Sequence, residues 1–66
     1  MRTYVIEWDY QGRNHGTYWE IHRHHTFEAE NREDARKQFD AWHEQHGAKN
    51  ERGKLRHPFH ITIHRT

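Results

Sequence analysis

The stretch 26-TFEAENREDARKQFDAWHEQH-46 decides the fold, because the hydrophobic period changes inside it. Asn31 is a favourable N-cap, and Asp34 follows three residues later, close to a capping box with Asp in place of Glu. Four side chains then recur at spacings of four, three and four, which mark one face of a helix: Ala35, Phe39, Trp42 and His46. Gly47 is a natural stop, so we expect one helix over residues 32–46.

Strand-like alternation lies on both sides of this helix. Residues 3–10 and 17–27 alternate apolar or aromatic side chains with polar ones, which is typical of half-buried strands. Residues 11–16 are rich in turn formers and predict a hairpin with a longish loop between the two strands. After Pro58, which can begin a strand, Phe59, Ile61 and Ile63 alternate with polar residues and predict a third strand.

The predicted order is therefore ββαβ, a small two-layer α+β domain over residues 1–66 with a three-stranded sheet. We expect the helix to lay Phe39 and Trp42 across one face of the sheet. The sheet residues expected beneath them are Tyr4, Ile6, Trp8, Trp19, Ile21, Phe59, Ile61 and Ile63. The pattern leaves the order of the strands open, because a helical connection permits either a parallel or an antiparallel neighbour.

Composition narrows the class of protein. Only 30% of the residues are hydrophobic, so a core of 66 residues is marginal, and a homodimer or a bound partner is one way to complete it. The absence of cysteine excludes disulfides, thiolate zinc sites and cysteine catalysis. Glu7 and Asp9 interrupt the first apolar run, so we do not expect it to be a signal peptide. No stretch approaches the length of a membrane span, and we expect a cytoplasmic protein without a membrane partner.

Histidine is the most unusual feature of the surface. Residues 22-HRHH-25 hold three of the nine histidines, and strand alternation puts His22, His24, His60 and His64 on the face away from the helix. They would form one patch if the second and third strands were neighbours. A solvated sheet face is one explanation and a metal site is another, since imidazole binds zinc, copper and nickel. No HExxH or other metal signature is present, so we assign no metal ligand and no cofactor.

Charge is unevenly distributed along the chain. The predicted helix is acidic, whereas the loop-like segment 47–57 carries Lys49, Arg52, Lys54 and Arg56 against Glu51 alone. Such a loop can meet phosphates, and nearby aromatic rings can stack on bases, so nucleic acid is an alternative partner. The net charge of only +1 argues against it, because nucleic-acid binders usually present a strongly basic face.

Catalytic equipment is sparse. The segments 24–27 and 60–63 both read His-x-Thr-x and resemble the active-site pair of two-histidine phosphoesterases, in which one His is general acid and the other general base. That family uses a far larger bilobed chain with a deep cleft, and His25 stands where it has an apolar residue. The chain has no serine and no glycine-rich phosphate loop. We therefore expect a protein that is not an enzyme.

The strand, strand, Asn31-capped helix and strand together resemble small bacteriophage proteins that bind and inhibit host RNA polymerase. The likeness spans the whole chain and is topological. It implies a phage-encoded modulator or inhibitor, acting in the host cytoplasm on a larger host protein such as RNA polymerase or a defence system. From the residues themselves we expect partner contacts on the basic segment and the outer sheet face: Tyr18, His22, His24, Arg52, Lys54, Arg56, His60 and His64.

Overall fold

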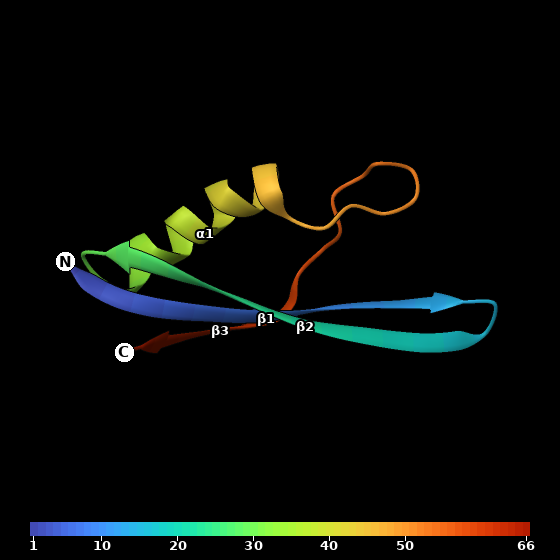
Figure 1. Cartoon of the computed structure of the whole chain (residues 1–66), viewed down its shortest axis with the longest axis horizontal. Coiled ribbons are helices and arrows are strands. Elements are labelled where there is room, and N and C mark those ends of the chain that lie inside the picture. Colours follow the sequence, from blue (N-terminus) through green and yellow to red (C-terminus); the bar gives the residue numbers. More distant parts are fainter.

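The computed structural model describes residues 1–66 as an open antiparallel sheet with one helix across one face (Figure 1). The elements in chain order are β1 (Arg2–Asn14), β2 (Thr17–Ala29), α1 (Arg32–His46) and β3 (Phe59–Arg65). The predicted ββαβ order and the α+β class are confirmed. The strand order is β2-β1-β3, so the first strand is central and both of its neighbours run antiparallel to it.

The hairpin of β1 and β2 is longer and tighter than the sequence predicted. The ladder runs from Arg2↔Ala29 to Asn14↔Thr17, and only His15 and Gly16 form the turn. Both have positive φ, 51° and 81°, as in the hairpin turns whose twist matches that of the strands. The predicted six-residue loop was wrong because residues 11–14 continue the ladder despite their turn-forming composition.

The helix has the predicted bounds. Asn31 Oδ1 accepts a hydrogen bond from the Asp34 amide at 2.8 Å, and Asp34 Oδ2 accepts one from the Glu30 amide at 3.0 Å. The second bond reaches one residue further back than in a standard capping box. At the other end the Gly47 amide donates to the His43 carbonyl at 2.8 Å. Gly47 is extended there, and a Cβ would lie only 2.6 Å from His43 Nε2, so close packing requires the glycine.

The core lies between α1 and the sheet half that β3 completes. Its buried apolar members are Tyr4, Ile6, Trp8, Tyr10, Phe27, Ala29, Ala35 and Phe39. Four predicted core residues only pack against its margin, namely Trp19, Trp42, Ile61 and Ile63. Ile21 and Phe59 remain 39% and 37% exposed, which corrects the prediction for both. For Ile21 the reason is coverage, because β3 pairs only with residues 4–9 of β1 and α1 lies over that same half (Figure 1). For Phe59 the reason is the register shift between Glu7 and Asp9, which pairs Phe59 with Asp9 of the opposite face.

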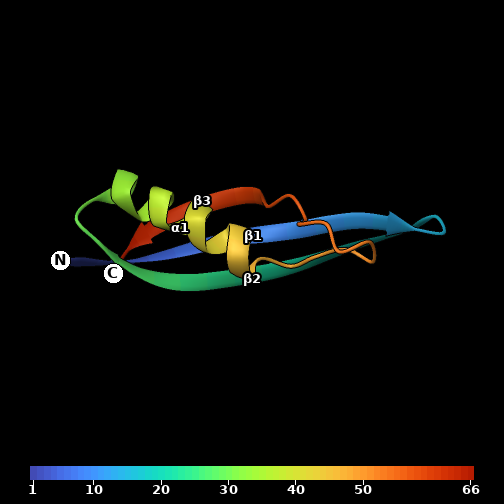
Figure 2. The same ribbon diagram turned by 90° about the horizontal axis from the view of Figure 1, so that it is seen from above.

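The molecule is elongated, with extents of 45 × 20 × 13 Å. The far half of the hairpin projects beyond α1, and the connection between α1 and β3 arches over it (Figures 1 and 2). Both termini lie at the opposite end, where Thr66 N donates to Thr3 O at 3.0 Å. No helix is both long enough and apolar enough to cross a membrane.

Candidate functional site

The residues expected to bind a partner fall into two groups. Arg52, Lys54 and Arg56 lie in the connection between α1 and β3, beside the projecting half of the hairpin. The other five lie on the sheet face away from α1: Tyr18, His22, His24, His60 and His64. The structure therefore divides the predicted surface into a basic group and a histidine group, which are described in turn.

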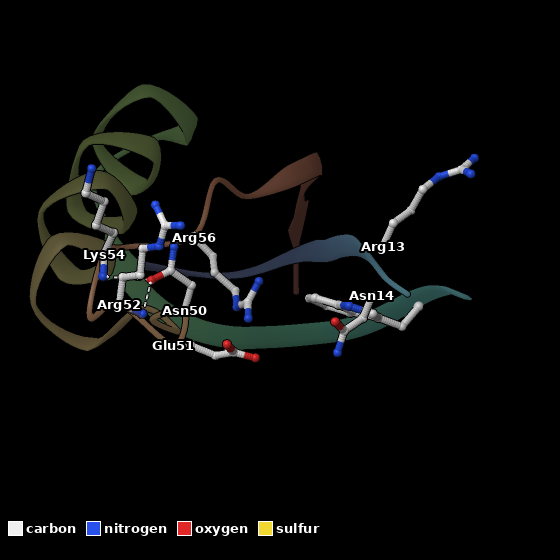
Figure 3. Close-up of a pocket in the computed structure, with 8 residues that line it drawn as sticks. Arg13, Asn14, Asn50, Glu51, Arg52, Lys54 and Arg56 are labelled. Carbon is white, nitrogen blue, oxygen red and sulfur yellow. Dashed lines mark hydrogen bonds between the residues drawn. The ribbon is translucent and has the colours of Figure 1, made fainter. Parts of the chain in front are cut away.

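The basic group surrounds a hollow of about 340 Å³, which we call the basic hollow (Figure 3). Its lining comprises Arg13, Asn14, Trp19, Asn50, Glu51, Arg52, Lys54 and Arg56. Figure 3 shows the residues of the 50–56 segment on one side and Arg13 and Asn14 of the hairpin on the other. Four cations thus face one carboxylate, so an anionic group entering the hollow meets an excess of positive charge.

Asn50 organises the segment that carries three of these cations. Its side-chain Oδ1 accepts hydrogen bonds from the backbone N–H groups of Arg52 at 2.9 Å and Lys54 at 3.0 Å. Its backbone N–H donates to Lys54 O at 2.8 Å. An isolated bridge joins Lys49 to Leu55, and Gly53 supplies a φ of 78°. The segment predicted as a loop is therefore a closed turn. Hydrogen bonds to the side chain and the backbone of Asn50 fix its shape.

Trp19 gives the basic hollow its only aromatic wall. The indole lies against Gly12 of β1, where an added Cβ would come within 2.5 Å of Trp19 Cζ2. The guanidinium of Arg56 lies 4.8 Å from the ring centroid, within range of a cation–π contact. Trp19, which the sequence predicts in the core, packs against the margin of the core and also lines the hollow. No signal in the sequence alone reveals it, because only the register of the hairpin shows that Gly12 lies directly opposite Trp19.

On the histidine face the rings do not form one continuous patch, because β1 separates β2 from β3. Carboxylates of β1 fill the gap. His22 Nδ1 contacts Asp9 Oδ1 from one side, and His60 Nδ1 lies 3.0 Å from Asp9 Oδ2 on the other. His64 Nε2 lies 2.8 Å from Glu7 Oε2. The face is thus a set of imidazole–carboxylate pairs across the sheet.

Asp9 is the most enclosed member of this set, with 8% of its surface exposed. Burial opposes ionisation, but the hydrogen bonds from His60 and His22 together outweigh it and hold the pKa of Asp9 below its usual range. Nearby, the Tyr18 hydroxyl donates to Glu20 Oε2 at 3.2 Å. Partial desolvation, followed by that hydrogen bond, raises the pKa of Tyr18. The carboxylate of Asp9 is therefore anionic at neutral pH and shared by two imidazoles.

The fold also places the two histidines of α1 and the two His-x-Thr-x segments. His43 is buried in the core side of α1, whereas His46 is exposed, so the helix offers no chelating pair and the predicted inward position of His46 was wrong. Desolvation is the main cause that lowers the pKa of His43. The two His-x-Thr-x segments lie on the outer strands β2 and β3 with β1 between them, and neither lines the basic hollow.

Comparison of the chain with family models, with curated proteins and with solved structures finds no match.

Proposed function

We propose that this protein is a non-enzymatic interaction module that binds an acidic surface of a larger protein through the basic hollow. One observation carries the proposal: Arg13, Arg52, Lys54 and Arg56 line one hollow together with the half-buried ring of Trp19. Arginine and tryptophan are the residues most enriched at the energetic centres of protein interfaces. Guanidinium groups also bind carboxylates in a bidentate manner, which gives geometric specificity as well as charge attraction.

The distribution of charge favours a protein partner over nucleic acid. Four of the eleven lysine and arginine residues line one hollow, and the net charge of the molecule is only +1. A nucleic-acid footprint is usually a basic face or stripe that follows many phosphates. On α1 the acidic residues would instead repel a phosphate backbone that continued past the hollow. A compact acidic patch on a folded protein needs only the contacts that the hollow offers.

The proposed mechanism is occupation of a surface. The closed turn and the hairpin fix the backbone that carries the cations before binding, which lowers the entropy lost on association. The lining side chains are cations, amides, one indole and one carboxylate, which suits recognition rather than bond-breaking. The likeness to phage proteins suggests a more specific form of this proposal. The protein would be a modulator or inhibitor of a host protein and would act in the cytoplasm of that host.

The test begins with capture from a bacterial lysate on protein immobilised through its C-terminus, which lies away from the hollow. One arm receives nuclease and another receives a chelator. We expect a stoichiometric protein band that survives both treatments. The captured protein is then purified and titrated with the wild-type chain, with Arg52→Glu and with Lys37→Glu as the charge-matched control on α1.

We expect 1:1 binding that Arg52→Glu weakens by at least about tenfold and that Lys37→Glu leaves unchanged. Equal losses in both variants would show attraction by net charge alone and would contradict the proposal. Loss of all captured material with nuclease would assign the hollow to nucleic acid. In that case log affinity should fall with log salt at a slope of about −3.6, or about −0.9 for each of four cations.

A further inference from the structure

We propose that the histidine face holds a divalent transition-metal ion, with zinc as the best fit, bound by Asp9, His22 and His60 and completed by Glu20. This site is separate from the basic hollow and does not depend on the proposed function. It reverses the expectation from sequence, which assigned no metal ligand because no sequence motif was matched.

The donor atoms already converge. One ligand atom from each of Asp9, Glu20 and His60 lies within 4.8 Å of the others. His22 lies beside this group and is not part of it: its Nδ1 contacts Asp9 Oδ1, so that nitrogen is the one placed to take the fourth position. Two imidazole nitrogens and two carboxylates form a nitrogen and oxygen set that zinc accepts in tetrahedral sites. Magnesium and calcium prefer oxygen ligands alone, so the set selects against them.

Ligands come from all three strands, which explains why sequence spacing does not reveal the site. Asp9 lies on β1, His22 and Glu20 on β2 and His60 on β3. Asp9 pairs with His22 directly across the hairpin. On the other side the ladder shifts register between Glu7 and Asp9, so the pairing with β3 is irregular beside the site. The irregularity is where His60 turns its ring towards Asp9.

The backbone of His60 has an unusual conformation at the proposed site. Its φ is 52°, a left-handed conformation that costs energy for a residue with a Cβ and that clusters at functional positions. The chain thus adopts an unfavourable backbone at the one β3 residue whose imidazole reaches Asp9. Gln11 Nε2 also lies 3.4 Å from the same nitrogen, His60 Nδ1.

Supporting contacts fix the oxygen ligands. The Tyr18 hydroxyl donates to Glu20 Oε2, which leaves Oε1 directed towards His22. Asp9 is nearly enclosed, with 8% of its surface exposed, so a cation bound there would displace little water from its carboxylate. Ligand groups held by outer hydrogen bonds in this way bind metals more tightly, by about 10- to 100-fold, than groups that lack them.

The same face supplies matched controls. His64 contacts only Glu7, and His24 lies opposite Glu7 in the ladder, yet both share the exposure and orientation of the proposed ligands. If zinc merely collected on exposed imidazoles, these two would matter as much as His22 and His60. The two pairs of histidines therefore separate a built site from casual binding.

The experiment is calorimetric titration of the full chain with zinc chloride at pH 7.5, with magnesium and calcium chloride in parallel. We expect one zinc per chain and no heat from the other two ions. His22→Gln and His60→Gln should each weaken zinc binding by about tenfold or more. His24→Gln and His64→Gln should bind as the wild type does. Ring nitrogen NMR should place the zinc-dependent shifts on His22 and His60.

If removal of His60 disturbs the sheet, Glu20→Gln tests another proposed ligand, because Glu20 is exposed and its substitution should not disturb the fold. It should weaken zinc binding while far-UV circular dichroism stays unchanged. Equal losses in all four histidine variants, several weak zinc ions per chain, or NMR shifts spread over all the exposed rings would each overturn the proposal. Any of these results would mean that the bound zinc is an adventitious ion only.

Discussion

At the scale of single residues, the hydroxyl of Tyr10 joins three parts of the molecule. It lies 2.7 Å from His43 Nε2 and accepts from the Ala48 amide at 3.1 Å. Because the amide can only donate, the hydroxyl proton is free to bond Nε2, and the neutral His43 then carries its proton on Nδ1. β1, α1 and the start of the basic segment thus meet at one oxygen.

Tyr10→Phe should therefore destabilise the fold by about 1–3 kcal/mol, since it leaves a buried imidazole nitrogen and an amide without partners. Urea unfolding followed by circular dichroism measures this change. Tyr18→Phe, which removes a hydroxyl from the exposed face, is the matched control and should have a much smaller effect. Equal effects would mean that the Tyr10 hydroxyl contributes no more than a surface group.

The buried imidazole of His43 also predicts a dependence of stability on pH. Desolvation lowers its pKa in the folded state, the charge of Asp40 partly opposes that shift and His57 adds to it. The unfolded chain, with a pKa of about 6.5 at this residue, then binds the proton more readily than the folded chain. The contribution is complete above about pH 6.5 and is lost as the pH falls from there towards the folded-state pKa.

We expect the free energy of unfolding to decrease between pH 7.5 and 5.5, and His43→Gln to remove part of that slope. The measurement is urea unfolding at a series of pH values. His46→Gln changes an exposed histidine on the same helix and should leave the slope as it is. A slope identical in wild type and His43→Gln would show that the fold does not favour the neutral form of this ring.

At the scale of elements, the sequence correctly predicted the helix ends, which depend only on residues close together in the chain. The bounds of α1 were correct because Asn31 and Gly47 act on their own ends of the helix. The hairpin turn was misplaced because Gly12 suggests a turn by composition, yet it lies in β1 to make room for the Trp19 ring. A glycine needed for close packing across strands cannot be told from a turn glycine without knowing the register.

This distinction can be measured with two alanine substitutions. Gly12→Ala should force the Trp19 ring off β1, since the new Cβ would overlap it, and should shift the Trp19 indole N–H resonance. Gly16→Ala meets no neighbouring atom but retains a φ of 81°, so it should cost about 1–2 kcal/mol and leave that resonance in place. An unmoved indole signal in Gly12→Ala would show that the hairpin adjusts without displacing Trp19.

At the scale of the whole molecule, the face of each strand was predictable but its neighbours were not. Alternation correctly placed His22, His24, His60 and His64 away from α1. It could not reveal that Asp9 and Glu7 lie between them, because strand order depends on contacts distant in the chain. The basic hollow was missed for the same reason, since Arg13 and Arg56 line one hollow only when the connection folds back over the hairpin.

The same topology predicts an uneven pattern of amide hydrogen exchange. Residues 4–9 of β1 pair with strands on both sides and lie beneath α1, whereas residues 10–14 pair with β2 alone. We expect the amides of residues 4–9 that bond to either neighbour to exchange most slowly, at the rate of global unfolding. Amides of residues 10–14 should exchange faster by local opening. Uniform protection along β1 would contradict this division, and NMR detects either outcome directly.

The position of the termini has a practical consequence. Thr3 and Thr66 lie side by side at the end of the long axis that is remote from the basic hollow. A fluorophore, a surface linker or a fused reporter can therefore be attached at either end while the cations stay open to a partner. Because the two ends adjoin, a short peptide could join them, and the chain could be cut at His15–Gly16 to give a circular permutant with the same sheet order.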